Sequence, residues 1–245
     1  MKAVILAAGQ GARLRPLTED VPKCMVTVAD RPMLRWSLDA VAEAGLREAV
    51  IVVGYRGEVI RDAFGSQYRN VAIRYVDNPD YATTNNLVSL WLARKELDGD
   101  VLLLEADLVY DAGLLKEFIT RPEPDAMVVA RYDGATTGTV VFVRNGRVSR
   151  LVLGKDQGEG FDYSEAWKTV NIWRFSREFL DRSYLPALDT WVERGEVGAY
   201  YEAPLGELIA AEPNRFAAFD AAGWRWAESD SPADLERAEA LFAGS

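Results

Sequence analysis

Alternation between apolar runs and helical segments is the feature that most limits how this chain can fold. Segments 32–45 and 85–99 carry leucines at helical spacing, and the first of them ends at Gly45. Strands that alternate with helices form βαβ units, so we predict an α/β fold: a Rossmann-like, mixed but mainly parallel sheet with helices on both faces. Five runs are hydrophobic almost throughout, as in strands covered on both sides: residues 2–8, 49–55, 71–77, 100–107 and 125–133.

The later part of the sequence has a different pattern. Residues 137–154 predict an antiparallel hairpin, because Asn145 and Gly146 tolerate the positive φ angles of a two-residue turn. We expect this hairpin to be a small insertion that flanks the sheet. Ser231 and Pro232 are typical of the first positions of a helix, which predicts a final helix after them.

Length and composition are those of an ordinary globular chain. The 245 residues are 49% hydrophobic and 27% charged, which is enough to build a sizeable core. No linker or low-complexity segment interrupts them. We therefore expect one domain over 1–245, with a nucleotide-binding half at 1–133 and an acceptor-binding half with the final helix at 134–245.

Charge and residue usage exclude several classes of function. The net charge of −10 argues against nucleic acid or an anionic membrane as a partner. The lone Cys24 excludes an intrachain disulfide, and the apolar stretch near Met1 is too short to cross a membrane, so a cytoplasmic protein is expected. There is no histidine, which excludes Ser/His and Cys/His nucleophiles and histidine zinc sites. Carboxylates, lysines, arginines and backbone amides remain.

A basic, glycine-containing loop follows the first predicted strand. Gly9 and Gly11 let backbone N–H groups approach an anion, and Arg13 and Lys23 supply positive charge that the chain otherwise lacks. Two known phosphate-binding loops are excluded. A dinucleotide-binding fingerprint would need glycine where Leu14 stands, and a Walker loop would need the sequence Gly-Lys-Ser/Thr, which is absent. An ordinary strand-to-helix loop has no reason to carry these basic residues and prolines together. The loop is therefore predicted to bind phosphates.

The loop reads GQGARLRP and then VPK, which resembles the signature of the nucleotidyltransferase superfamily that activates phosphorylated metabolites with nucleoside triphosphates. Ala12 departs from the Thr or Ser of that signature, and a backbone amide can replace the lost hydroxyl. Further blocks resemble the branch that transfers cytidylyl groups to phosphocholine and to phosphonates: residues 78–93, 102–111, 168–180, 197–202 and 224–241.

The resemblance implies a magnesium-dependent transfer from CTP to a small phosphorylated or phosphonate acceptor, with release of pyrophosphate. Asp107 and Asp230 match metal-ligating positions, with Glu228 and Glu202 as alternatives, while Lys23 and Arg13 would be catalytic by neutralising phosphate charge. The acceptor phosphate is already largely ionised at neutral pH, so no general base is needed. Asp107 as a turn residue and Asp230 as a helix cap are the structural alternatives.

Base selection is expected from the first loop and from the polar segment 83–86. Asn85 has helix N-capping as an equally good interpretation. Backbone groups around Leu6 and Ala8, with Asn86 and Ser89, would read the cytosine edge. The full set expected to bind the nucleotide is Leu6, Ala8, Gly9, Gly11, Asn85, Asn86, Ser89 and Glu105.

Five of the seven tryptophans lie after residue 166, where aromatic residues cluster near acidic ones. Lys168 and Asn171 are expected to face the acceptor phosphate or the nucleotide sugar, and Lys168 favours an aminoethylphosphonate-like acceptor because phosphonate enzymes resemble this segment more. A cage for the ammonium group of an acceptor is expected from four side chains, although each ring could instead fill the core or an oligomer interface: Trp173, Tyr201, Glu202 and Trp226.

Two other functions stay open. One is a sugar-1-phosphate or inositol-1-phosphate nucleotidyltransferase, which predicts hydroxyl-binding polar residues around the acceptor. The other is a non-catalytic nucleotide-binding regulator, because fold alone does not fix function. Retention of the basic and acidic residues named above weighs against a regulator. A homodimer is compatible with the sequence.

Overall fold

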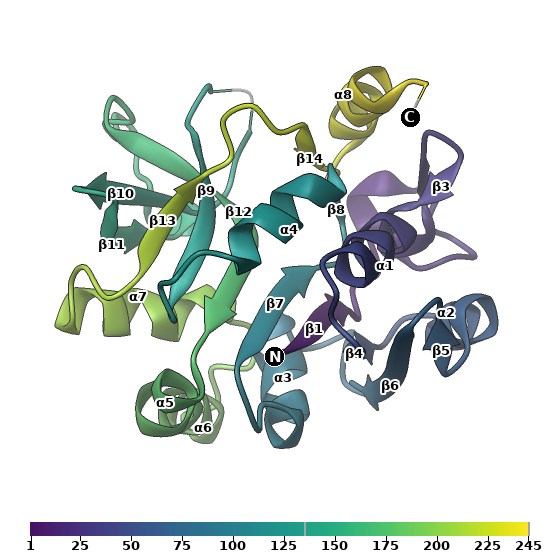
Figure 1. Ribbon diagram of the computed structural model, residues 1–245, viewed down its shortest axis with the longest axis horizontal. Coiled ribbons are helices and arrows are strands. Elements are labelled where there is room, and N and C mark those ends of the chain that lie inside the picture. Colours follow the sequence, from purple (N-terminus) through teal and green to yellow (C-terminus); the bar gives the residue numbers. More distant parts are fainter. Residues whose placement is uncertain (135, 245) are drawn as a thin grey trace.

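The strands predicted for the first half lie side by side. The computed structural model describes residues 1–134 and 136–244, and within these ranges ten strands form one sheet in the order β10-β11-β13-β9-β12-β7-β1-β4-β6-β5 (Figure 1). The strands are β1 (Lys2–Ala7), β4 (Glu48–Val53), β5 (Gln67–Tyr68), β6 (Val71–Asp77), β7 (Val101–Glu105), β9 (Ala126–Arg131), β10 (Val140–Arg144), β11 (Arg147–Val152), β12 (Ala166–Phe175) and β13 (Ala217–Asp220).

Parallel pairing is concentrated in the nucleotide-binding half of the chain. Strands β7, β1, β4 and β6 are parallel neighbours, and β9 and β13 form a second parallel pair. Strand β12 runs antiparallel between β7 and β9 and joins the two regions. In β1, Leu6 pairs with Glu105 and Ala7 pairs with Val53, so the carboxyl ends of these strands meet at one edge. The predicted Rossmann-like mixed sheet is confirmed.

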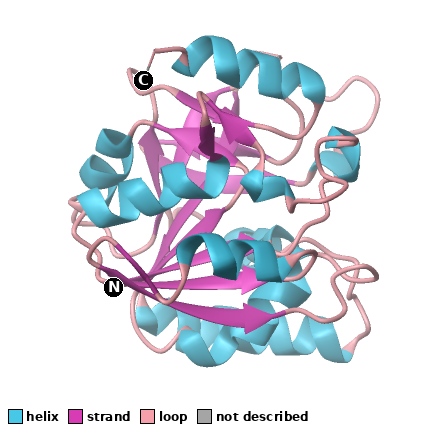
Figure 2. Cartoon of the chain, turned by 90° about the vertical axis from the view of Figure 1, so that its right-hand side faces the viewer, coloured by secondary structure: helices cyan, strands magenta, loops and turns pink. Residues whose placement is uncertain are grey.

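Helices cover both faces of the sheet, as Figure 2 shows. Side chains alternate across β1: Val4 and Leu6 belong to one core cluster, while Ala3 and Ile5 belong to the other, which explains why the strand is apolar throughout. The first core cluster includes residues of α1 (Met33–Glu43), α2 (Gly57–Phe64) and α4 (Ala112–Ile119), and the second those of α3 (Asn86–Leu92), α5 (Arg177–Phe179), α6 (Leu185–Glu193) and α7 (Glu202–Ala211).

Two small sheets and the last helix complete the chain. Strand β8 (Leu108–Tyr110) pairs with β14 (Trp226–Glu228), and β2 (Thr27–Val28) pairs with β3 (Arg31–Pro32). Helix α8 (Pro232–Phe242) begins as expected, because the Ser231 hydroxyl accepts a hydrogen bond from the Asp234 N–H while the Asp234 carboxylate accepts one from the Ser231 N–H. In the described ranges no helix is long and apolar enough to span a bilayer.

The hairpin is correct in form but different in position. Strands β10 and β11 are antiparallel, and their turn has the expected positive φ angles, 51° at Asn145 and 73° at Gly146. The pair is not an insertion beside the sheet, because β10 also pairs with β12 and β11 with β13. The hairpin is therefore part of the main sheet and links β12 to β13.

Candidate active site

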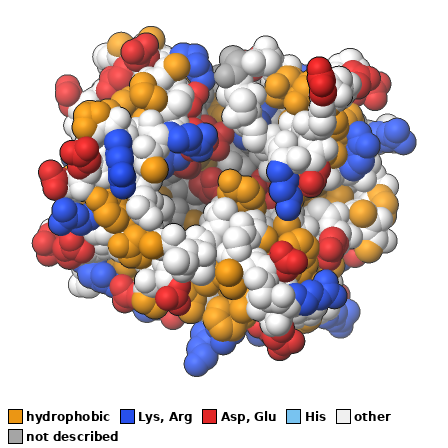
Figure 3. Space-filling model, turned by 180° about the vertical axis from the view of Figure 1, so that it is seen from behind, with side chains coloured by type: hydrophobic (Ala, Val, Ile, Leu, Met, Phe, Trp, Pro, Cys, Tyr) orange, Lys and Arg blue, Asp and Glu red, His pale blue; other side chains and the backbone are white. Residues whose placement is uncertain are grey.

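A cleft of about 770 Å³ opens at the carboxyl edge of the central strands. This volume is in the range of small-molecule sites. The molecular face in Figure 3 is hollowed near its centre, where acidic and basic side chains meet. The walls of the cleft come from the loop after β1, the start of α3, the end of β7, and strands β12 and β14 with the residues around them.

The loop after β1 is fixed by its glycine and by Lys23. Gly11 has φ 64°, and a Cβ atom added there would lie 2.8 Å from the Cβ of Lys23, so a side chain is excluded. The Thr18 hydroxyl donates a hydrogen bond of 2.8 Å to the Gly11 carbonyl. Around the Cβ position of Gly9 there is open space. The loop thus holds Lys23 against the cleft and leaves the backbone near Gly9 accessible.

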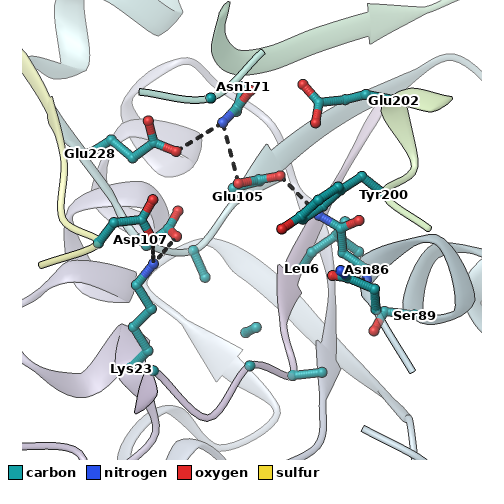
Figure 4. Close-up of a pocket in the computed structure, with 18 of the residues that line it drawn as sticks. Leu6, Lys23, Asn86, Ser89, Glu105, Asp107, Asn171, Tyr200, Glu202 and Glu228 are labelled. Carbon is teal, nitrogen blue, oxygen red and sulfur yellow. Dashed lines mark hydrogen bonds and ion pairs between the residues drawn. The ribbon is translucent and has the colours of Figure 1, made fainter. Parts of the chain in front are cut away.

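Four charged side chains from distant parts of the sequence meet beside this loop, and we call Arg13, Lys23, Asp107 and Asp230 the first-loop cluster. The Lys23 ammonium donates to Asp107 and, at 2.5 Å, to Asp230, and Arg13 pairs with Asp230 at 2.7 Å. The structure therefore brings both expected basic residues together with both expected metal-ligating residues (Figure 4 shows Lys23 and Asp107).

Electrostatics keep Lys23 and Asp230 of the first-loop cluster ionised. Burial alone would lower the pKa of Lys23, but the Asp107 and Asp230 carboxylates outweigh it and raise that pKa above its ordinary value. For Asp230, burial would raise the pKa, and Lys23 and Arg13 lower it below its ordinary value. Lys23 is therefore a permanent positive charge and not a base at neutral pH.

A second group of ionisable side chains lies deeper in the cleft, around β12. We call Glu105, Lys168, Asn171, Glu202 and Glu228 the β12 cluster. The Asn171 amide donates to Glu105 at 3.3 Å and to Glu228 at 3.2 Å, and Lys168 donates to Glu228 at 3.0 Å and to the Thr169 carbonyl at 2.9 Å. In Figure 4 the Asn171 amide lies between Glu105 and Glu228.

Backbone geometry aims Asn171 into the cleft. Its φ is 59°, which asparagine tolerates better than most residues, and the pairing of β12 with β9 shifts register between Thr169 and Trp173. This irregularity turns Asn171 toward Glu105 and Glu228, while the strand beyond it returns to regular pairing with β7. A local break in the sheet therefore builds the polar wall of the cleft.

Three carboxylates in the cleft offer oxygen ligands for a metal ion. Glu105, Asp107 and Glu228 each present one oxygen, and these oxygens lie within 4.8 Å of one another. One Asp107 oxygen, Oδ1, is buried and has no hydrogen-bond partner among the residues that the structure describes. Such an oxygen set matches the preference of Mg²⁺. Asp230 is not in this triad and instead shares Lys23 with Asp107.

The residues expected to read the base all line the cleft, but several side chains are already engaged. Asn85 caps α3, since its Oδ1 accepts from the Asn86 N–H at 2.8 Å. The Asn86 amide donates to Glu105 at 3.2 Å and accepts from the Tyr201 N–H at 2.9 Å. Ser89 accepts from Asn78 at 3.0 Å. The capping interpretation of Asn85 is therefore observed, and the other two side chains brace the wall of the cleft.

Three of the four residues expected to form an aromatic cage lie outside the cleft. Trp173 is fully buried against Phe175 and Phe216, and Tyr201 is fully buried in the same core cluster. Trp226 lies in β14 and packs against the opposite core cluster. Trp173 and Tyr201 therefore fill the core, which was the alternative interpretation, and the partly buried Trp226 packs against it. Only Glu202 of that set lines the cleft.

Sequence reasoning also missed residues that do line this end of the cleft, among them Thr139 and Tyr200. Tyr200 is half exposed, while the next residue is fully buried, so the ring that reaches the cleft is one position earlier than expected. Thr139 directly precedes β10, after Gly138 with φ 108°. In the sequence, Gly138 followed by Thr139 at the start of the predicted hairpin was the feature that could have indicated a cleft residue there.

Comparison with known proteins agrees with this architecture. A choline-phosphate cytidylyltransferase of Streptococcus pneumoniae is 29% identical over 218 residues, covering 82% of this chain and 92% of that protein. A CMP-5'-(3-aminopropyl)phosphonate synthase of Streptomyces rubellomurinus is 36% identical over 244 residues, covering 99% of this chain, which spans only 39% of that relative's length. A solved structure of CTP:phosphocholine cytidylyltransferase from Streptococcus pneumoniae has a TM-score of 0.79 at 23% identity, covering 98% of each chain, and so shares the fold.

A family model describes most of the sequence. Residues 3–198 match the MobA-like NTP transferase domain, and this range contains the loop after β1, the end of β7 and all of β12. Asp230 and Glu228 follow the matched range but line the same cleft. The chain therefore belongs to the family of MobA-like NTP transferase domains.

Proposed function

We propose that this chain is a cytidylyltransferase that transfers CMP from CTP to a small phosphonate or phospho-alcohol and releases pyrophosphate. The observation that carries the proposal is the first-loop cluster, in which Lys23 and Arg13 meet Asp107 and Asp230 beside the glycine loop. The printed names of two relatives, one for an aminopropylphosphonate and one for choline phosphate, support this acceptor class.

The chemistry is a displacement at phosphorus. An oxygen of the acceptor phosphonate attacks the α-phosphorus of CTP, a P–O bond forms there, and the bond to the β-phosphate oxygen breaks so that pyrophosphate leaves with its electron pair. The acceptor oxygen is already ionised at neutral pH, so no residue has to take its proton. Lys23 and Arg13 hold positive charge where the triphosphate would lie, which stabilises charge that develops on the leaving group.

Magnesium is the metal that the donor set fits best. Asp107, with Glu105 and Glu228, would supply its ligands, and Asp230 lies next to them through the shared Lys23. When bound, the ion would neutralise phosphate charge and hold the two substrates in line. Asp107 would then exchange its contact with Lys23 for the ion, which leaves the Lys23 ammonium available to the phosphates.

Pyrophosphate release tests the proposal. The purified chain is incubated with Mg²⁺ and each of CTP, UTP, dTTP, ATP and GTP, paired with 2-aminoethylphosphonate, choline phosphate, inositol-1-phosphate or glucose-1-phosphate. We expect release only with CTP and an acceptor that carries an amine or ammonium group. Turnover of glucose-1-phosphate or inositol-1-phosphate above all others would replace the proposal by a sugar or inositol nucleotidyltransferase. Absence of pyrophosphate release with every pair would favour a non-catalytic nucleotide-binding regulator.

A further inference from the structure

Glu202 is the buried acid of the cleft that the proposed chemistry does not use. It is the first residue of α7 and only 5% exposed, yet it lines the cleft. The Thr139 side chain lies close enough to this carboxylate to lower its pKa. One oxygen of Glu202, Oε1, is buried without a hydrogen-bond partner in residues 1–134 and 136–244. An unpartnered buried acceptor is costly, so a donor from a bound ligand is the natural partner.

The charge around Glu202 points to a positively charged donor. The β12 cluster contains three glutamates, Glu105, Glu202 and Glu228, and one basic residue, Lys168. The Lys168 ammonium is already held by Glu228 and by the Thr169 carbonyl, and its pair with Glu228 is the one ion pair found for it within the described residues. With Glu105 and Glu228 assigned to the metal ion, Glu202 is the glutamate of this cluster for which the described residues show no ion pair, and a positively charged ligand group would supply one.

The shape of that cation follows from what lines the cleft. Trp173 and Tyr201, which could have surrounded a methylated ammonium, are buried in the core, and the partly buried Trp226 packs against it, so none of the three lines the cleft. Among the described lining residues the aromatic side chains are Tyr81 and Tyr200, and Figure 4 shows Tyr200 below Glu202. A trimethylammonium group has no N–H to donate and relies on aromatic faces. A primary ammonium donates three hydrogen bonds, which suits a carboxylate with a free oxygen.

We propose that Glu202 determines acceptor specificity: it accepts a hydrogen bond from a primary ammonium at the end of the acceptor far from the reacting phosphonate and thereby selects amino acceptors over trimethylammonium acceptors. The inference rests on the proposed cytidylyl transfer and deepens it. It replaces the expected aromatic cage by a single buried carboxylate.

An acceptor series tests this specificity directly. Transfer from CTP is measured as kcat/KM for 2-aminoethylphosphonate, its N-trimethyl analogue, and ethylphosphonate, which carries a phosphonate but no ammonium group. Hydrogen bonds to charged groups contribute enough that the wild-type chain should prefer the amine over both analogues about 10- to 100-fold. In Glu202→Gln this preference should fall to within about threefold, with the loss seen mainly in the KM of the amine.

Ethylphosphonate and a matched variant separate a specific contact from damage to the fold. Glu202→Gln should use ethylphosphonate as well as the wild-type chain does. Glu207→Gln removes the same charge from the same helix at an exposed position outside the cleft, so it should keep the wild-type preference.

Two results would overturn the inference while cytidylyl transfer itself stood. They are equal use of all three acceptors by the wild-type chain, and an equal loss with all three in Glu202→Gln. Absence of transfer to any acceptor under every condition would overturn the proposed function and this inference together.

Discussion

In the first-loop cluster two basic side chains face two acidic ones, and each is engaged in an ion pair. In the β12 cluster one lysine faces three glutamates, and burial raises the pKa values of Glu105, Glu202 and Glu228. The first region is balanced, and its Lys23 and Arg13 can exchange their internal pairs for a triphosphate, while Asp107 would share a metal ion with Glu105 and Glu228 of the second region. The second is short of positive charge and is completed by a cation. The two ends of one cleft thus differ in the ligand charge that they require.

Of the variants that test this difference between the two regions, removal of Lys23 should have the largest effect, and the effect is on kcat. Lys23→Met removes the charge that would face the leaving phosphates, so kcat should fall about 10²- to 10³-fold. Initial rates of pyrophosphate release with saturating substrates measure it. Lys116→Met, at an exposed position of α4, is the matched control and should keep the wild-type rate. A kcat for Lys23→Met within threefold of the control would remove Lys23 from the mechanism.

Loss of Lys168 should destabilise the fold, because it leaves buried glutamates without their cation. We expect Lys168→Met to lower the free energy of unfolding by about 3 kcal/mol at pH 8. The raised pKa values of Glu228 and Glu202 mean that these groups take up protons as pH falls, so the deficit should shrink toward pH 5. Urea unfolding at both pH values measures this. A deficit in the free energy of unfolding that is the same at pH 5 and pH 8 would contradict the charge argument. The control is Lys95→Met, which replaces an exposed lysine.

Metal affinity should distinguish the two aspartates that share Lys23. Asp107 belongs to the carboxylate triad and Asp230 does not, so Asp107→Asn should weaken binding of Mn²⁺ in the presence of CTP by at least about tenfold. Asp230→Asn should have a smaller effect. Electron paramagnetic resonance of free Mn²⁺ gives both affinities without reference to turnover. A larger loss of Mn²⁺ affinity in Asp230→Asn than in Asp107→Asn would assign the metal to Asp107 and Asp230, the pair expected from the sequence.

Acceptor preference should depend modestly on pH. Burial raises the pKa of Glu202 to about 7, against the opposing effects of Lys168 and Thr139. Below that pH the carboxyl is protonated, and above it the carboxylate can bind an ammonium, which stays protonated throughout this range. Relative to the same ratio in Glu202→Gln, the ratio of kcat/KM for 2-aminoethylphosphonate to that for ethylphosphonate should therefore rise roughly five- to tenfold from pH 6 to pH 8. The titratable groups around Glu202 are Glu105, Lys168, Tyr184, Tyr201 and Glu228.

The Glu202→Gln profile is the control, because its amide does not titrate in this range. It corrects for the ionisation of the two phosphonates, which differs because the ammonium group of 2-aminoethylphosphonate lowers the second pKa of its own phosphonate. Identical profiles in the wild-type chain and in Glu202→Gln would separate Glu202 from recognition of the amine.

The sequence was sufficient for the first-loop cluster and not for the β12 cluster, for a physical reason. Asp107 ends one parallel strand and Lys23 lies in the loop after another, so motif and topology predicted that they meet at one edge, while Asp230 was placed with them by the family resemblance. The orientation of Trp173 depends on the break in β12 at Asn171, a backbone irregularity that alternation of residues does not reveal. The hairpin likewise was visible in the sequence, but its place in the sheet depends on long-range pairing.

One measurement tests the central claim most directly: identification of the product formed from CTP and 2-aminoethylphosphonate. Phosphorus NMR and mass spectrometry of the reaction should show CMP joined to the phosphonate through a P–O–P linkage, with one pyrophosphate released for each product molecule. The N-trimethyl analogue in the same assay should give little of the corresponding product. Recovery of unchanged CTP and phosphonate under conditions where the chain is folded, or equal yields from the two acceptors, would contradict the account of a cleft with a triphosphate end and an ammonium end.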